Sequence, residues 1–191
     1  MSAVTPGHFM VLPSSKNNYN TKKIQIHNNT FLDVLKTNKK FSTFYELVRM
    51  SKTEYIFNST LNNNFIGNSN LLNYNKSFTL FLPENQYLEK YSDFLSNIDY
   101  ATASAIVLYH VVEKSYSYNF LKGDENMNRN NVVLKTISSD PMNKKLEIIS
   151  KDNKVYINSC NKIFIKGGLN TVLLNGVVHI IDDLMIHPSH L

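Results

Sequence analysis

The chain has 191 residues, of which 42% are hydrophobic and 12% aromatic, and it carries a formal net charge of +5. That length suits one well-buried core and is short for two, so we expect a single globular domain. Its 18 lysines are scattered as single residues and short pairs, and Arg49 and Arg129 are the only arginines, so the charge predicts a solvated lysine surface and excludes nucleic acid as the expected partner.

Residues 1–30 are expected to form an extended arm. They are polar, contain Pro6, Gly7 and Pro13, and show neither helical nor strand periodicity. Their one apolar run, residues 9–12, is too short for the core of a signal peptide, so a conventional secretory signal is not expected. The longest apolar run of the chain, around residues 105–112, is far below the length that spans a membrane.

Two helices are predicted after the arm. Phe31, Leu32 and Leu35 form the first apolar stripe, and a second stripe at helical spacing follows a polar break. The second stripe consists of Phe41, Phe44, Leu47 and Val48. Ser42 or Thr43 is the expected N-cap of this second helix.

The middle of the chain predicts one strand and two further helices. An apolar run from Phe78 to Leu82 reads as a strand that ends at Pro83. A helix is predicted from Glu84 to Phe94, and another after Asp99, its expected N-cap. The residues expected to face inward are Tyr87, Leu88, Tyr91 and Phe94 in the first helix, and Ile98, Ala101, Ala105 and Leu108 in the second. The chain then acquires strand character at residues 109–112.

The last third of the chain predicts strands. Short β-branched runs, several of which alternate polar and apolar residues, occupy 132–137, 146–149, 155–157 and 163–165. The dipeptide Asn175-Gly176 between two apolar runs predicts a hairpin with a tight type I′ turn. Because helices come first and strands later, the order favours an α+β fold.

Four separated segments resemble the fasciclin (FAS1) domain family. They are the opening helices at 31–44, the strand–proline–helix box at 77–88, the Tyr-His motif in residues 108–112, and the hairpin box at 175–184 with Pro188. The resemblance covers residues 31–188, leaves 189–191 as a tail, and implies a wedge-shaped β-sandwich with helices packed along one edge.

This resemblance implies a non-catalytic adhesion or assembly module that binds a protein partner, outside the cell or at its surface. In some animal members the Tyr-His region takes part in receptor recognition. Carried over, the expected partner-binding residues are Tyr109, His110, Val107, Leu108, Val111 and Val112. The structural alternative is that Tyr109 and His110 form a buried, hydrogen-bonded pair.

No catalytic or metal site is expected. His187 and His190 have a ligand-like separation but lie at the chain end, and His179 lies near Asp182 on a strand where the two side chains point to opposite faces. Cys160, the single cysteine, has no partner for a disulfide within the chain and no ligand-spaced neighbour. No cofactor is expected.

Two functional hypotheses stay open. In the first, the domain binds a protein and residues 1–30 dock on a neighbouring subunit, for example on the surface of a virion or another particle. In the second, the 11 Tyr and 11 Phe residues line a groove that carries a small apolar pigment or lipid.

Overall fold

The structure is a computed structural model. It describes residues 29–58, 77–123, 131–141, 144–152, 154–158, 162–166 and 171–186, and the statements below concern these residues. Apart from Asn29 and Thr30, the predicted arm lies outside them, as does the tail 189–191.

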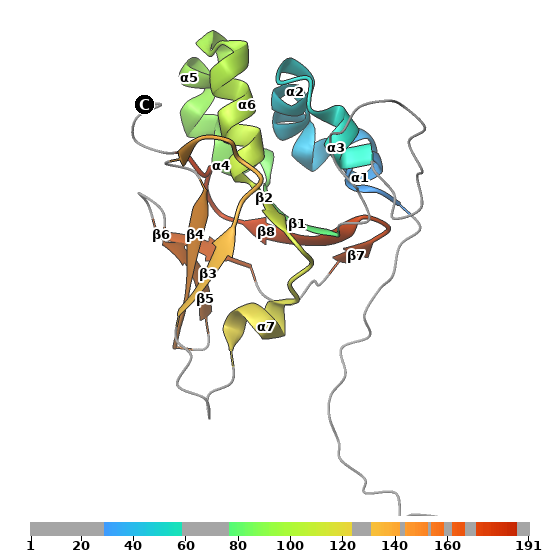
Figure 1. The fold of residues 1–191 in the computed structure, drawn as a ribbon. Coiled ribbons are helices and arrows are strands. Elements are labelled where there is room, and N and C mark those ends of the chain that lie inside the picture. The colour runs from blue at the N-terminus through green and yellow to red at the C-terminus, as the bar shows by residue number, and fades with distance from the viewer. Residues whose placement is uncertain are drawn as a thin grey trace, which may run out of the picture.

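Most of the helices lie together on one side of the strands (Figure 1). The helices and 3-10 turns are α1 Phe31–Thr37, η1 Lys39–Phe41, α2 Ser42–Met50, α3 Glu54–Asn58, α4 Asn85–Leu88, η2 Glu89–Tyr91, α5 Ser92–Asn97, α6 Tyr100–Tyr109 and α7 Tyr118–Lys122. Only α7 stands apart from this group, at the other end of the strands. The two helices predicted from the first apolar stripes are therefore confirmed as α1 and α2.

The start of α2 differs from the prediction. Neither Ser42 nor Thr43 caps the helix, because the 3-10 turn η1 leads directly into it. Asn38 caps that turn instead, and its side chain accepts a hydrogen bond from the backbone N–H of Lys40 at 3.1 Å. By contrast, α1 begins with a full capping box between Thr30 and Asp33.

The predicted helix from Glu84 to Phe94 is divided into α4, η2 and α5. Of the four side chains expected to face inward, Leu88 is buried, whereas Tyr87, Tyr91 and Phe94 are only partly buried. Leu95, one residue past the predicted end, is buried as well. A distant carboxylate holds the 3-10 turn between α4 and α5: Lys90 Nζ and the Tyr91 hydroxyl each donate to Asp183 at 2.9 Å. A contact from the end of the chain thus shapes a segment that looks continuous in sequence.

Helix α6 has the predicted cap but buries a different face. Asp99 accepts a hydrogen bond from the backbone N–H of Thr102 at 2.7 Å, as expected for an N-cap. The buried side chains are Ala103, Ile106, Val107 and Tyr109, whereas the predicted contact residue Ala101 is exposed. Apolar and small residues occur on all sides of α6, so its sequence has no helical period from which to identify the packed face.

All eight strands belong to one strongly rolled sheet. They are β1 Phe78–Pro83, β2 Val111–Glu113, β3 Asn131–Lys135, β4 Lys145–Lys151, β5 Lys154–Asn158, β6 Lys162–Ile165, β7 Thr171–Leu173 and β8 Gly176–Ile181. Their order is β2-β1-β8-β6-β5-β4-β3, with β7 paired to β8 beside β6. The pair β1–β8 is parallel and the other pairs are antiparallel.

The two ends of this sheet approach each other and nearly close a barrel. A bridge joins Val112 to Thr136, and the backbone N–H of Ile137 donates to the carbonyl of Val111 at 3.0 Å. One core cluster lies between the helices and β1, and a second lies inside the roll. The α+β prediction is confirmed, and β1, buried at all six positions, belongs to both clusters.

The predicted hairpin is present, but its turn lies one residue earlier. Leu173 pairs with Gly176, so Leu174 and Asn175 form the two-residue loop. Neither has a positive φ, which excludes a type I′ turn. Gly176 has φ +150°, and a Cβ added there would lie 1.9 Å from the carbonyl oxygen of Phe78. The glycine therefore serves the close approach of β1 rather than the turn.

Among the described residues, no helix has the length and apolar character needed to cross a bilayer.

Candidate functional site

The predicted partner-binding segment runs from the end of α6 into β2. The residues Val107, Tyr109, His110, Val111 and Val112 are buried, each with at most 6% of its surface exposed. Leu108 is partly buried and packs against the helix-side core. The structure therefore gives this segment a packing role in the described conformation, and its role in binding stays a prediction.

His110 is fully buried and hydrogen bonded through both ring nitrogens. Nδ1 lies 2.8 Å from the carbonyl oxygen of Ile106, and Nε2 accepts from the backbone N–H of Met185 at 3.1 Å. Since Nε2 accepts, the ring proton resides on Nδ1 and is donated to Ile106. Burial lowers the pKa of His110 to about 4, so the ring is neutral at physiological pH.

This histidine connects four parts of the fold. Its ring meets the Phe44 ring of α2 edge-on, with 5.0 Å between centroids. Its carbonyl oxygen accepts from the backbone N–H of Phe81 in β1 at 3.0 Å, while Met185 belongs to the end of the chain. His110 thus fixes the position of α2 through its contact with Phe44.

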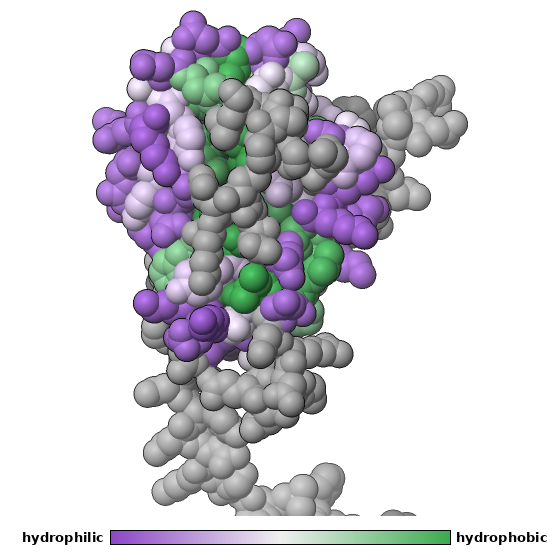
Figure 2. Space-filling model, turned by 90° about the vertical axis from the view of Figure 1, so that its left-hand side faces the viewer, coloured by the Kyte–Doolittle hydropathy of each residue, from purple (hydrophilic) through white to green (hydrophobic). Residues whose placement is uncertain are grey.

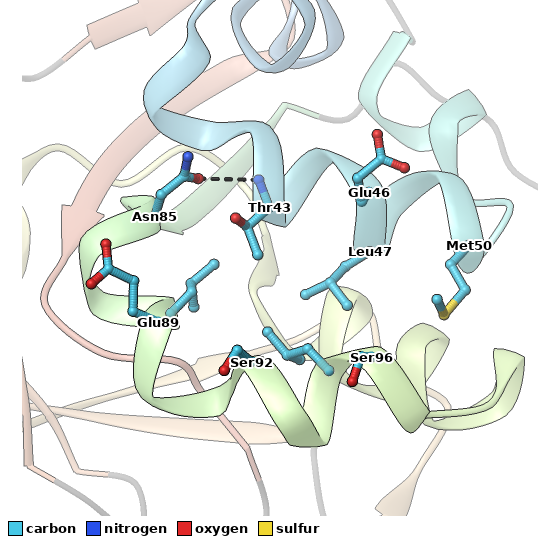
Figure 3. A pocket seen from close by; sticks show the side chains of 10 residues that line it. Thr43, Glu46, Leu47, Met50, Asn85, Glu89, Ser92 and Ser96 are labelled. Atoms are coloured by element: carbon cyan, nitrogen blue, oxygen red, sulfur yellow. Dashed lines mark hydrogen bonds between the residues drawn. The ribbon is translucent and has the colours of Figure 1, made fainter.

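A groove of about 500 Å³ lies between α2 and the α4–α5 segment (Figure 3). Three buried leucines, Leu47, Leu88 and Leu95, contribute its apolar lining. The full lining is Thr43, Glu46, Leu47, Met50, Asn85, Leu88, Glu89, Ser92, Leu95 and Ser96. None of these residues is aromatic, so this groove is not the aromatic-lined pocket that the carrier hypothesis expects.

Asn85 fixes one end of the groove. Its Oδ1 accepts from the backbone N–H of Thr43 at 3.1 Å (Figure 3). Its Nδ2 donates to the carbonyl of Lys39 at 3.0 Å and to the hydroxyl of Ser42 at 2.9 Å. One side chain of α4 therefore ties down the start of α2, and the distance between the two walls is set there.

The rim of the groove combines negative charge with one exposed apolar side chain. Glu46 and Glu89 lie on opposite walls, and Glu46 is paired with Arg49 at 3.0 Å. Met50 is 40% exposed at the end of α2. The apolar lining lies beneath carboxylates and hydroxyls. Such a groove suits a ligand that carries an apolar side chain next to a basic group, a combination that a protein segment provides.

Sequence reasoning did not identify this groove. Its walls come from segments about 40 residues apart, and each contributes ordinary polar positions. The one usable signal was Met50, an apolar residue beyond the buried stripe of α2.

The residues weighed for acid–base chemistry have structural roles. His179 is 1% exposed, its Nε2 lies 2.7 Å from the carbonyl oxygen of Tyr116, and its ring stacks on Phe81. Burial lowers the pKa of His179 as it does that of His110. Asp182 accepts a hydrogen bond from the backbone N–H of Phe164 at 2.7 Å.

Within the described residues, no three His, Cys, Asp or Glu side chains are grouped closely enough to hold a metal ion. The other residues weighed for metal binding or disulfide formation, Cys160, His187 and His190, lie outside the described part of the chain.

Comparison with known proteins gives one family and one fold. The model of the fasciclin domain matches residues 39–187. A solved structure of a FAS1 domain pair from the insect cell adhesion molecule fasciclin I superimposes with a TM-score of 0.63 at 20% identity. The match covers 85% of this chain and 52% of that one, so the present chain spans about half of the pair. No curated protein sequence matched.

Proposed function

The chain belongs to the fasciclin domain family, and from that membership we propose that it is a non-catalytic module that binds a protein partner in adhesion or assembly. Domains of this family are typically adhesion modules. The partner-binding surface that we propose is the groove between α2 and the α4–α5 segment.

The observation that supports this surface is the composition of the groove. It offers the exposed side chain of Met50, which a partner can bury, beside two carboxylates that select for positive charge; the leucines beneath are already buried. The segment from Val107 to Val112 enters the proposal as a positioning element. Its His110 packs on Phe44, one turn before Leu47 of the lining, and so fixes the wall against which a partner would press.

An adhesion assay with paired variants tests this proposal. Beads coated with the chain are mixed with one another and with cells of the source organism, and attachment is counted. Met50→Lys removes the exposed apolar side chain and places a positive charge where the proposed partner carries a basic group, and we expect about a tenfold loss of attachment.

Tyr55→Lys is the matched control, since Tyr55 is 62% exposed on α3 and lies outside the groove lining. It should leave attachment within about twofold of the parent. Equal losses in both variants, or no attachment by the parent chain, would count against the groove.

The proposal also covers where the protein acts. Fasciclin domains usually act outside the cell or at its surface, and we propose one of these locations or the surface of an assembled particle. Fractionation of the source distinguishes them: the chain should pellet with cell envelopes or with particles and resist a salt wash. Recovery only as a free cytosolic protein contradicts all of these locations.

A further inference from the structure

The outer face of strands β3 to β6 gathers lysines that are scattered in the sequence. Residues 131–166 contain seven lysines and three acidic residues, a net charge of +4 out of +5 for the whole chain. Side chains alternate along these strands, so the buried positions point into the roll and the others point outward. Figure 2 shows the molecule from the side on which β4 and β6 lie in Figure 1, where hydrophilic residues border hydrophobic ones.

Two pairs of lysines stand directly opposite each other across neighbouring strands. Lys135 faces Lys145 at one end of β4, and Lys151 faces Lys154 at the other end. All four are exposed. Like charges in direct cross-strand register destabilise a sheet, so their placement costs stability in the free domain. Such a local conflict is typical of a functional surface.

Acidic groups offset part of this charge, and Lys166, directly after β6, is paired with Glu84 at 3.3 Å. Glu113 binds Lys135 at 2.9 Å, and Glu147 accepts a hydrogen bond from Asn131 at 3.1 Å. Asp152 occupies the turn between the second pair of lysines. Within the part of the chain that the structure describes, Lys145, Lys151 and Lys154 form no ion pair.

An apolar strip crosses the same face between the two lysine pairs. Ile149, Tyr156 and Phe164 are cross-strand neighbours in one row, and each is partly exposed. Val133, on the adjoining strand, is 62% exposed. Lys145 and Lys151 are six residues apart on β4, so the positive ends of the face are separated by about 20 Å.

We propose that this face binds an extended acidic segment of a partner protein, with apolar side chains on the strip and carboxylates at both lysine pairs. This second surface is separate from the groove, so the inference goes beyond the proposed function and does not depend on it. Opposite charge at both ends fixes the register of such a segment, and burial on the strip supplies affinity.

The geometry favours protein over nucleic acid or sulfated polysaccharide. Stacking of bases or sugars needs open, flat rings, but the Tyr156 and Phe164 rings meet at 52° with 5.6 Å between centroids. Lys154 lies 6.0 Å from the centre of the Phe164 ring and covers it in part. All seven basic residues of the segment are lysines, whereas arginine is the side chain suited to forked contacts with phosphate or sulfate.

A direct binding assay tests the inference. The probe is a fluorescein-labelled peptide in which Leu-Phe-Leu separates two runs of three glutamates, titrated with the full chain in an anisotropy measurement at 50 mM and 200 mM salt. We expect saturable binding that weakens with salt, and at least threefold weaker binding of a peptide with Ser-Gly-Ser at its centre.

Lys151→Glu gives the informative variant. It replaces a repulsive pair by an attractive one, so the melting temperature should rise by about 1–2 °C while peptide binding weakens about threefold to tenfold. Lys154→Gln should also weaken binding without loss of stability. The matched control is Lys36→Glu, which makes the same charge change on the exposed side of α1 and should leave binding within twofold.

Any of three results overturns the proposal. They are the absence of saturable binding up to 1 mM peptide, a loss of affinity in Lys36→Glu equal to that in Lys151→Glu, and equal affinity for the peptides with Leu-Phe-Leu and Ser-Gly-Ser at the centre. Thymidine oligonucleotides and heparin are run alongside. Tighter binding of either one than of the acidic peptide, with the same response to Lys151→Glu, assigns the face to that class of polyanion and also overturns the proposal.

Discussion

The Asn175 side chain lies in the core, where its amide serves two helices. Its Oδ1 accepts from the backbone N–H of Phe31 at 3.0 Å, and its Nδ2 donates to the carbonyl of Phe57 at 2.9 Å. The side chain therefore joins the start of α1 to the end of α3, from a loop more than a hundred residues away. Asn-Gly predicts a turn from sequence, but nothing in the dipeptide indicates that its amide is buried.

Replacing this residue should be costly. Asn175→Ala leaves a buried N–H and a buried C=O without partners, and we expect the free energy of unfolding to fall by about 2–4 kcal/mol in urea denaturation. Asn97→Ala is the control, because Asn97 bonds only within exposed α5 and its loss should cost less than about 0.5 kcal/mol. Equal costs at both positions would contradict the role assigned to the buried amide.

His110 makes stability depend on pH in the acidic range. Its pKa is about 4 in the folded chain, whereas an unperturbed histidine has a pKa of 6.5, so between those values the unfolded state binds more protons. The contribution is therefore complete above about pH 6.5, declines as pH falls, and is lost below about pH 4. A shift of this size corresponds to about 3 kcal/mol.

Denaturation at several pH values checks this expectation. His110→Gln cannot titrate, so its unfolding free energy should depend less on pH between 4 and 6.5 than that of the parent chain. Because burial also lowers the pKa of His179, the variant should keep part of the slope. Identical slopes in variant and parent would show that His110 does not titrate in this window.

At the scale of elements, the strands were easier to predict than the helices. The sequence of β5 alternates between the two faces of the sheet, and β6 is a short apolar run of β-branched and aromatic residues, so both strands could be predicted from the sequence. The α6 sequence is apolar on all sides and gives no such period. The break between α4 and α5 depends on Asp183, which no local pattern reveals. The groove was missed for the same reason, because its walls are brought together by tertiary contacts, among them those of Asn85.

The parallel pair β1–β8 yields a prediction about glycine. Gly176→Ala would place a Cβ against the backbone of Phe78 and also strain a φ of +150°, so we expect a loss of more than about 3 kcal/mol. Gly123→Ala is the comparison for backbone conformation: Gly123 follows α7 with φ 75° and ψ 176°, a combination found almost only in glycine, and its replacement should cost about 1–3 kcal/mol. Thermal melts of both variants measure the difference, and similar losses would contradict the steric argument.

At the scale of the whole molecule, the two core clusters meet at β1 and β8. Leu80 belongs to the helix-side cluster and Phe81, the next residue, to the cluster inside the roll. A strand buried on both faces couples the clusters, so the helices and the rolled strands should unfold together in one transition. We therefore expect the described elements to behave as one domain, which a single unfolding transition seen by both circular dichroism and tyrosine fluorescence would check.

The boundary of that domain gives the last prediction. The described fold begins at Asn29, whose carbonyl accepts from the backbone N–H of Leu174 at 2.9 Å. A chain begun at Asn29 should melt within about 2 °C of the full chain, since every described core side chain is retained. A chain begun at Asn38 lacks α1 and with it the buried side chains of Phe31, Leu32 and Leu35. Burial of each of them stabilises the fold by about 2 kcal/mol, and the total is comparable to the whole free energy of unfolding of a domain.

Light scattering on the same chains tests the arm. If residues 1–30 dock on a neighbouring subunit, as we propose, the full chain should assemble and the chain begun at Asn29 should stay monomeric at an unchanged melting temperature. Equal assembly by both would place self-association on the folded surface, where the groove and lysine-face variants can locate it. A large loss of stability at Asn29 would instead make the arm part of the domain, because only segments that contribute buried contacts change the melting temperature on removal.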